Sequence, residues 1–415
     1  LPMNTFTVIF LIALGAMLAT QLWLAHRHIR YVGARRAHVP QAFDGQIPLA
    51  AHQKAADYTV ARARLGQIEN VYGAVLLLLW TVGGALAMLD AWWRGTIDSP
   101  LWLGTAFMLT VLVLTGLLDL PFTIYRTFYL EQRFGFNRTT PAVFIADLAK
   151  KTLLLLALGV PLVLAALWLM YAMGRYWWLY VWLLWFGFSV SMVWAYPALI
   201  APLFNKFKPL TQESVRQRIE GLLARTGFRS RGIYVIDSSR RTTHGNAYFT
   251  GFGRNKRIVF FDSLLQTLNE DEVEAVVAHE LGHFKLKHIV KRIGWMAVVS
   301  LLGLALLGWL IEQPWFYDGL GAGVPSAHMA LMLFLMVIPV FTFFLSPLMA
   351  QRSRRHEYEA DDFAAQTSNA AALVRALVKL YRENAATLTP DPLHSAFYDS
   401  HPPALARIAH LARGL

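Results

Sequence analysis

Seven stretches of the chain are apolar over about 20 residues, the length that an α-helix needs to cross a membrane. We therefore expect transmembrane helices at roughly residues 5–25, 69–90, 101–124, 152–173, 177–202, 294–312 and 329–350. No small-residue cleavage site follows the first stretch, so it predicts a retained helix and not a signal peptide. Met3 is expected to be the natural first residue.

The polar stretch between the fifth and sixth apolar segments has the pattern of a small soluble domain. Residues 211–227 predict a helix with Thr211 as its cap and Gly227 as its end. Residues rich in β-branched and aromatic side chains predict strands at 232–239, 244–253 and 256–265.

A second helix is predicted after these strands. Asn269 is its expected cap, and Glu270, Asp271 and Glu272 crowd its first turn, where the helix dipole favours negative charge.

These elements predict a mainly α polytopic membrane protein with a small α+β domain. We expect four segments along the chain: residues 1–202 with five membrane helices, 203–293 as the soluble insert, 294–350 with two further membrane helices, and 351–415 as a C-terminal soluble part.

Composition supports the membrane interpretation and narrows the chemistry. Hydrophobic residues make up 56% of the 415 residues and charged residues only 15%, which is too apolar for an ordinary soluble protein of this length. The chain has no cysteine, which excludes disulfides and thiolate metal ligands. Its net charge of +12 could suggest nucleic-acid binding, but in a membrane protein the location of the charges matters more than their sum. We expect membrane lipid as a partner and no nucleic acid.

The location of the basic residues predicts the orientation. With seven spans, 36 of the 38 Lys and Arg residues fall in one set of connections, and the opposite set holds only Arg94 and Arg175. Because cytoplasmic connections carry the excess of basic residues, the N-terminus is expected outside and the soluble parts in the cytoplasm.

A candidate metal site lies in the stretch HELGH at residues 279–283. On a helix, His279 and His283 lie one turn apart on one face, so both imidazoles can reach one ion. Glu280 is the next residue around the helix and is placed to act as a general base on a water at that ion. Two imidazoles and a carboxylate suit one Zn²⁺ ion, which in catalytic sites keeps a position open for water.

A third ligand is expected in the stretch RRHEYEADDFA. Glu357 is the candidate, and Asp361 follows on the same helical face, where it could orient a histidine ligand. Both HELGH and Glu357 lie within a few turns of a predicted span, so the metal is expected at the cytoplasmic membrane interface. The alternative is a charged helix beside the membrane with no metal role.

Three further histidines lie in or near these motifs. His288 and His356 lie off the faces of the proposed ligands and are expected to be solvated or to support those ligands. His401 precedes two prolines, and by itself this pattern indicates only a turn.

Taken together, the motifs resemble those of the integral-membrane type I CAAX prenyl proteases. The resemblance rests on HELGH at 279–283, EYEAD at 357–361, NAYF at 246–249 and SHPP at 400–403, with RFGFN at 133–137 and PLFNKF at 202–207 in support. The order of these motifs is far more specific than HExxH alone. The short connections and the lack of a long tail suggest a bacterial member in a bacterial inner membrane.

The resemblance implies seven helices around a large water-filled chamber that the zinc domain caps. It implies His279, His283 and Glu357 as zinc ligands, Glu280 as the base and His401 as the group that stabilises the oxyanion. Asn246, Ala247 and Tyr248 would lie along the substrate, with Asn246 bonding its backbone; without the resemblance they predict only an edge strand. Eukaryotic members remove the last three residues of prenylated proteins, and some make a second cut upstream. The expected substrate is a peptide or protein, with prenylated and other membrane-associated proteins both left open.

Two other functions stay open at this point. A membrane-protein quality-control peptidase of the heat-shock type shares HExxH and a distant Glu, although it usually has four spans. A transporter with a non-catalytic zinc would need several ionisable residues inside the spans. Only Asp119 lies well inside an apolar stretch, with Asp90 and Glu312 at edges.

Overall fold

A computed structural model describes residues 4–250 and 256–413. Met3, the expected first residue, and Gly251–Gly253, the expected end of a strand, lie outside the described residues. The long helices are α1 (Thr5–Ala34), α2 (Leu49–Trp80), α3 (Ala85–Arg94), α4 (Pro100–Tyr125), α5 (Pro141–Ala172), α6 (Trp177–Ala195), α11 (His288–Leu310) and α13 (Ala327–Thr342).

The protein is mostly helical, with six or seven spans. In the described part of the chain, six helices are long and apolar enough to cross a membrane, or seven if α2 and α3 form one bent span. Those two helices are bent by 45° at their junction, where Gly84 adopts a φ of 80° that favours glycine. The break falls inside the second predicted span, which was expected to be one continuous helix over roughly residues 69–90.

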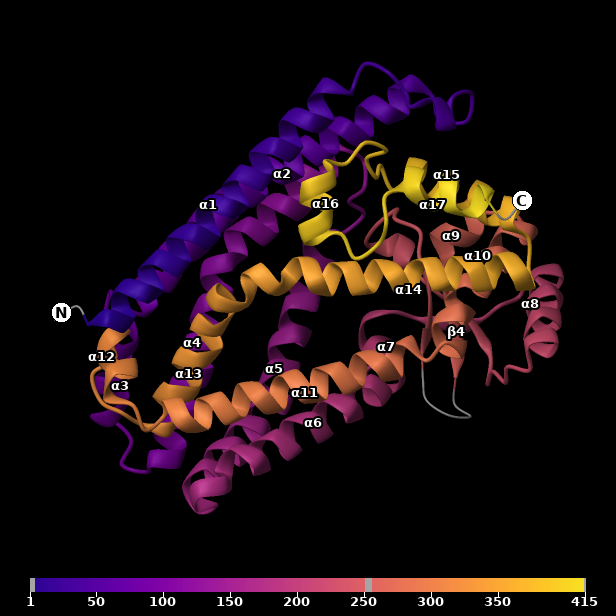
Figure 1. Ribbon diagram of the computed structural model, residues 1–415. Coiled ribbons are helices and arrows are strands. Elements are labelled where there is room, and N and C mark those ends of the chain that lie inside the picture. Colours follow the sequence, from indigo (N-terminus) through magenta and orange to yellow (C-terminus); the bar gives the residue numbers. More distant parts are fainter. Residues whose placement is uncertain (1–3, 251–255, 414–415) are drawn as a thin grey trace.

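The membrane helices pack as long pairs (Figure 1). Helices α1 and α2 run side by side, α6 and α11 form a second pair, and α4 packs against α5 and α13. The shorter helical segments are η1 (Gln41–Phe43), η2 (Arg126–Glu131), η3 (Gly174–Tyr176), η4 (Tyr196–Ile200), α7 (Ala201–Phe204), η5 (Ser238–Arg240), α12 (Pro314–Gly319) and η6 (Phe343–Leu345).

The soluble part contains a four-stranded sheet in the order β1-β2-β4-β3. Its strands are β1 (Phe207–Pro209), β2 (Ile233–Ile236), β3 (Ala247–Thr250) and β4 (Arg257–Phe261). Strand β2 is parallel to β4, and the other two pairs are antiparallel. All three predicted strands are present: β2 and β4 are shorter than expected, β3 begins later than expected, and β3 lies at an edge. Strand β1 was not predicted, because three residues ending in proline show no alternating pattern.

Two predicted boundaries are wrong for identifiable reasons. The chain leaves β4 at Asp262 to begin α9 (Asp262–Thr267), because the Asp262 carboxylate accepts hydrogen bonds from the backbone N–H groups of Ser239 and Ser263. Helix α8 (Glu213–Thr226) ends at Gly227 as predicted, with a φ of 62°. Thr211 is not its cap: the preceding Leu210 still donates its N–H to the Ile233 carbonyl, so the chain stays extended and the helix begins later.

The insert and the C-terminal residues share one hydrophobic core. Side chains from α8, β3, β4 and α9 pack with those of α10 (Glu270–Lys285), α14 (Ser346–Thr367), α15 (Ala370–Glu383) and α17 (Ala404–Ala412). Helix α14 follows α13 after one short turn and runs alongside α10 (Figure 1). Helix α16 (Pro392–Tyr398) packs against α14 and α1. This arrangement brings residues around 280, 357 and 401 together.

Candidate active site

Helix α10 positions the two histidines of HELGH. Asn269 caps it as predicted: its side chain accepts from the Glu272 N–H, and the Glu272 carboxylate accepts from the Asn269 N–H. This reciprocal cap fixes where the helix begins. His279 and His283 follow on one face, with His279 buried and His283 partly exposed.

Helix α14 brings in the predicted carboxylates. Glu357 and Asp361 lie one turn apart and are both buried. Their helix approaches α10 closely at Gly282, where an added Cβ would come within 3.0 Å of the Ala360 Cα and 3.2 Å of its carbonyl oxygen. Glycine in HELGH therefore allows the two helices to meet, and the meeting brings Glu357 to the histidines.

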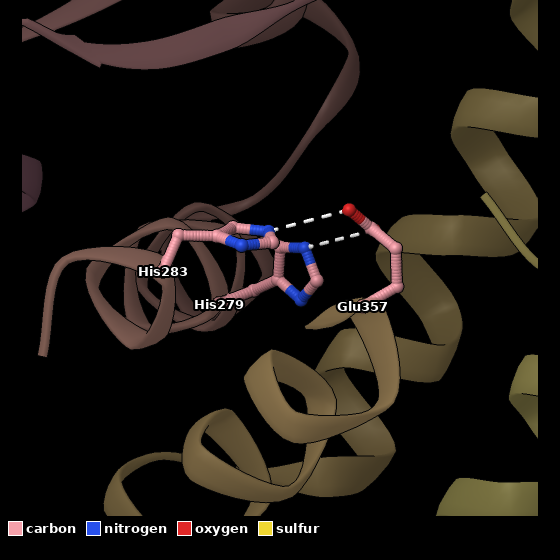
Figure 2. A group of neighbouring side chains, drawn as sticks. All are labelled: His279, His283 and Glu357. Atoms are coloured by element: carbon pink, nitrogen blue, oxygen red, sulfur yellow. Dashed lines mark ion pairs between the residues drawn. The ribbon is translucent and has the colours of Figure 1, made fainter. Parts of the chain in front are cut away.

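The three predicted ligands converge in the structure (Figure 2). Glu357 Oε2 lies 3.5 Å from His279 Nε2, and Glu357 Oε1 lies 3.4 Å from His283 Nε2. One nitrogen of each histidine and one carboxylate oxygen all lie within 4.8 Å of one another. Such a cluster of imidazole nitrogens and a carboxylate oxygen has the donor set of a metal site.

The hydrogen bonding of Glu357 supports a cation at this place. Its Oε2 atom is buried and has no hydrogen-bond partner among the residues that the structure describes. Leaving a buried carboxylate oxygen unsatisfied is costly, and a bound cation would remove that cost. The residues present therefore fit a divalent metal ion.

Asp361 contacts His279 on the side of the ring that faces away from Glu357. Its Oδ1 lies 2.8 Å from His279 Nδ1, so the ring presents Nε2 to Glu357. Burial alone would lower the pKa of His279, but the hydrogen bond to Asp361 and the neighbouring Glu357 carboxylate raise it to about 9. This contact agrees with the predicted place of Asp361.

Arg407 is a residue that the sequence reasoning missed. Its guanidinium donates from Nε and Nη2 to the two carboxylate oxygens of Asp361 at 2.8 and 2.5 Å, and the pair is buried. The two-pronged contact fixes the Asp361 carboxylate, which in turn orients His279. Arg407 lies 46 residues after Asp361 on α17, and no local pattern connects the two.

Glu280 is placed differently from the ligands. Within the described part of the chain its carboxylate makes no side-chain hydrogen bond or ion pair, and burial raises its pKa. A carboxylate with a raised pKa and no protein partner is suited to take up a proton.

The structure brings His401 to the cluster. Its Nε2 lies 3.5 Å from Glu357 Oε1, and its Nδ1 lies 3.0 Å from the Ser400 hydroxyl. The Tyr381 hydroxyl donates to the Pro402 carbonyl, and Arg354 on α14 donates to the Asp399 carbonyl. These two contacts, neither of which was predicted, hold the turn on both sides of His401.

The NAYF residues lie at the edge of the sheet. Ala247 and Tyr248 lie on β3, which pairs with β4 and contacts α10. The Asn246 side chain accepts from the Ala247 N–H, and the Asn246 carbonyl accepts from the Phe261 N–H. Strand β3, with Ala247 and Tyr248, lies beside the helix that carries His279, and among the described residues none of the three forms a hydrogen bond with the cluster.

A cavity of about 810 Å³ lies beside His401. Its lining includes residues of α1, α2 and η2, together with His244, Tyr381 on α15 and Asn384 after it. The proposed ligands do not line this cavity, and His401 lies between it and the cluster.

Comparison with known proteins finds similarity to one family over most of the chain. Residues 28–206 match the family described as "CAAX prenyl protease N-terminal, five membrane helices", and residues 209–414 match "Peptidase family M48". The CAAX prenyl protease 1 homolog of Oryza sativa subsp. japonica is 37% identical over 82% of this chain and 80% of its own. CAAX prenyl protease 1 of Saccharomyces cerevisiae is 29% identical over 95% of this chain and 93% of its own.

The solved structures agree. The crystal structure of S. mikatae Ste24p superposes with a TM-score of 0.91 and 28% identity, covering 99% of this chain and 100% of that one. This fold and the family matches support the peptidase over the heat-shock-type and transporter interpretations. These three relatives come from eukaryotes, so they give no support to the expected bacterial origin or bacterial inner membrane.

Proposed function

Because this chain belongs to the CAAX prenyl protease family of M48 metallopeptidases, we propose that it is a zinc endopeptidase whose single metal is held by His279, His283 and Glu357. The protein is an integral membrane metallopeptidase. The observation that carries the proposed ligand set is the convergence of three donor atoms within 4.8 Å around a buried carboxylate oxygen that has no hydrogen-bond partner in the described part of the chain.

Zinc bound at this cluster would supply Lewis acidity toward a water and a peptide carbonyl. Glu280 takes the proton from the attacking water and transfers it to the amine that leaves. Its raised pKa supports this role, because a base must hold the proton between the two steps.

His401 stabilises the negative charge that develops on the carbonyl oxygen. If the Ser400 hydroxyl donates to Nδ1, the ring proton lies on Nε2, which is the nitrogen directed toward Glu357 and the cluster. Nε2–H is then free to donate to the substrate oxygen.

The substrate peptide adds to the free edge of β3. Asn246, Ala247 and Tyr248 offer main-chain groups for an extended peptide, a mode in which backbone hydrogen bonds supply affinity and side-chain pockets supply specificity. Asn246 contributes its side chain to the substrate backbone once its local bond to the Ala247 N–H is released.

The relatives and the cavity support the substrate class that we propose. The relatives carry the name CAAX prenyl protease, and in this chain the cavity beside His401 extends among membrane helices. We place the cleaved peptide at the cluster and the prenyl group of the substrate among the membrane helices.

The orientation of the site is part of the proposal. The concentration of Lys and Arg in one set of connections supports a cytoplasmic active site and an outside N-terminus. Single cysteines introduced into this cysteine-free chain provide the test. A cysteine at the exposed position 324 should react with an impermeant reagent on intact cells, and one at the exposed position 229 should not; the reverse pattern contradicts this orientation.

The function is tested with purified protein in detergent or lipid discs. A farnesylated peptide ending in a CAAX sequence should lose its last three residues, as detected by mass spectrometry. A chelator should abolish cleavage and zinc should restore it. The matched peptide without farnesyl should be cut much more slowly.

Glu280→Gln is the variant control. It should keep zinc and lose turnover by orders of magnitude, because the amide cannot take the proton. Cleavage that survives chelation, or full turnover in Glu280→Gln, would refute the proposed mechanism. Equal cleavage of both peptides would remove only the preference for prenylated substrates.

A further inference from the structure

A second group of metal-type side chains lies directly behind His283. His288, His356 and Glu359 each offer an atom within 4.8 Å of the others. The His288 and His356 rings stack with centroids 4.2 Å apart and planes 8° apart. Taken by itself, this group has the donors of another metal site.

The backbone brings His288 back toward His283. Lys287 adopts a left-handed conformation with a φ of 57°, which is uncommon for a residue with a side chain. This turn ends α10 and begins α11 at His288. The His288 side chain is thereby buried with only 5% of its surface exposed.

Two short contacts then define the role of His288. Its Nδ1 lies 2.9 Å from His283 Nδ1, and its Nε2 lies 2.9 Å from Glu359 Oε2. Glu359 also lies 3.3 Å from Arg355 Nε and 4.0 Å from Lys291 Nζ, and these cations favour its ionised form. The contacts form a chain from His283 through His288 to Glu359.

The positions of the protons in this chain can be derived. His283 directs Nε2 toward Glu357, and an imidazole that binds a metal through Nε2 carries its proton on Nδ1. That Nδ1–H can donate to His288 Nδ1, which must then have a free lone pair. Neutral His288 therefore carries its own proton on Nε2 and donates it to the ionised Glu359.

This assignment excludes a second metal on His288. To bind a metal through Nε2 while accepting from His283 at Nδ1, the ring would need a lone pair on both nitrogens and would have to lose its last proton. While His283 is a metal ligand, His288 and Glu359 therefore support it through hydrogen bonds and do not bind a second metal.

We infer that His288 and Glu359 are positioning residues that fix the ring orientation and the tautomer of His283 toward the metal. The inference rests on the proposed ligand set of His279, His283 and Glu357. It gives His283 a counterpart to the support that Asp361 provides for His279, with a histidine inserted between the ligand and the carboxylate. Outer partners of this kind typically change metal affinity by about 10–100-fold when removed.

The test measures zinc affinity and stoichiometry of the full chain by competition with a chromophoric chelator. His288→Ala should weaken zinc binding by about 10–100-fold. His288→Asn should recover most of the affinity, because its side-chain oxygen can replace Nδ1 as the acceptor. Glu359→Gln, at a partly exposed position, should weaken binding less than His288→Ala. His356→Ala is the control and should bind one zinc with unchanged affinity.

Cobalt in place of zinc adds a spectroscopic readout. The visible absorption bands of the Co²⁺ protein should shift in His288→Ala, return toward the original in His288→Asn, and stay unchanged in His356→Ala. Thermal unfolding of the metal-free variants identifies any that fail to fold. If the His288 variants do not fold, the zinc affinity of Glu359→Gln, which keeps His288, tests the inference.

Three outcomes would overturn the inference. The first is unchanged zinc affinity and unchanged cobalt spectra in folded His288→Ala and Glu359→Gln. The second is an equal loss of zinc affinity in His288→Ala and His288→Asn. The third is the binding of two zinc ions per chain, one of which disappears in His356→Ala. Glu357→Ala separates this test from the proposed function. Full zinc occupancy in Glu357→Ala would refute the ligand set. Loss of zinc in Glu357→Ala together with unchanged zinc affinity in His288→Ala would refute only the positioning role.

Discussion

Gly282 on α10 lies against Ala360 on α14, so closely that an added Cβ would come within 3.0 Å of the Ala360 Cα. Both residues lie among the metal-site residues: Gly282 immediately precedes His283, and Ala360 immediately precedes Asp361. The spacing of these two helices therefore determines the distance between the histidines and Glu357. We therefore expect helix packing and metal binding to depend on the same contact.

Gly282→Ala should consequently weaken zinc binding. The added methyl group meets backbone atoms, which cannot rotate away, so α10 and α14 must separate by a few tenths of an ångström. Overpacking of this kind costs about 1–3 kcal/mol. Zinc competition and thermal unfolding measure the effect.

Gly221→Ala on α8 is the matched control, since its added Cβ would meet only the flexible end of Arg225 at 3.5 Å. That variant should be neutral or gain up to about 1 kcal/mol from helix propensity. Equal behaviour of the two variants would contradict the role given to the Gly282 contact.

Arg407 should matter for the metal although it does not touch it. Arg407→Ala leaves the buried Asp361 carboxylate without its cation, and breaking a buried ion pair typically costs about 3–5 kcal/mol. We expect lower thermal stability and weaker zinc binding. Arg407→Lys keeps the charge but not the two-pronged contact. Its thermal stability and zinc affinity should therefore lie between those of Arg407→Ala and the unmodified protein.

The exposed Arg413→Ala provides the control for Arg407 and should match the unmodified protein. If Arg407→Ala keeps both its stability and its zinc affinity, the support of His279 through Asp361 is not needed.

Zinc binding should strengthen as the pH rises toward about 9. The pKa of His279 is raised to about 9 in the metal-free protein, so a proton occupies the ring at pH 7 and must leave before a metal binds. The apparent affinity should then rise by up to about tenfold per pH unit for this one proton. Metal-free protein should show the opposite trend. Its stabilisation by protonated His279 is full below the ordinary histidine pKa of about 6.5 and is lost as the pH passes through about 9.

Chelator competition and unfolding at pH 6.5, 7.5 and 8.5 measure both trends. Asp361→Asn should lower the pKa of His279 and flatten the rise in zinc affinity, because it removes the carboxylate that favours the charged ring. A slope that is the same in both proteins would show that another group controls the competition.

His401→Ala should lower kcat by about 10²–10³ while KM and zinc content stay close to those of the unmodified protein. The reason is that the Nε2–H contributes only when charge develops on the substrate oxygen. Steady-state kinetics on the farnesylated peptide separate kcat from KM. A raised KM with unchanged kcat would make His401 a substrate-binding residue instead.

The sequence alone indicated the parts of the site that depend on helical spacing. His279 and His283 are four residues apart, as are Glu357 and Asp361, and in a helix that spacing determines the shared face. The capping by Asn269 was also predictable, because its bond to Glu272 is local. The apolar stretches similarly indicated about seven spans.

Contacts between distant segments could not be predicted in this way. Arg407 reaches Asp361, and Tyr381 reaches Pro402, only because α15 and α17 pack onto the same core as α10. His288 was expected to be solvated or to support the ligands. Its burial behind His283 depends on the left-handed turn at Lys287, a residue type that gives no signal of that conformation. The resemblance, and not residue spacing, placed His401 at the site.

The division of the proposed metal ligands between α10 and α14 also affects when the site can form during synthesis of the chain. Ribosomes make proteins from the N-terminus, so HELGH emerges first, then the membrane helices α11 and α13, and only afterwards Glu357. Arg407, which holds Asp361, emerges later still. With the proposed ligand set, the metal site stays incomplete until α13 and α14 have been made, and we expect no cleavage of the nascent chain or its neighbours before that point.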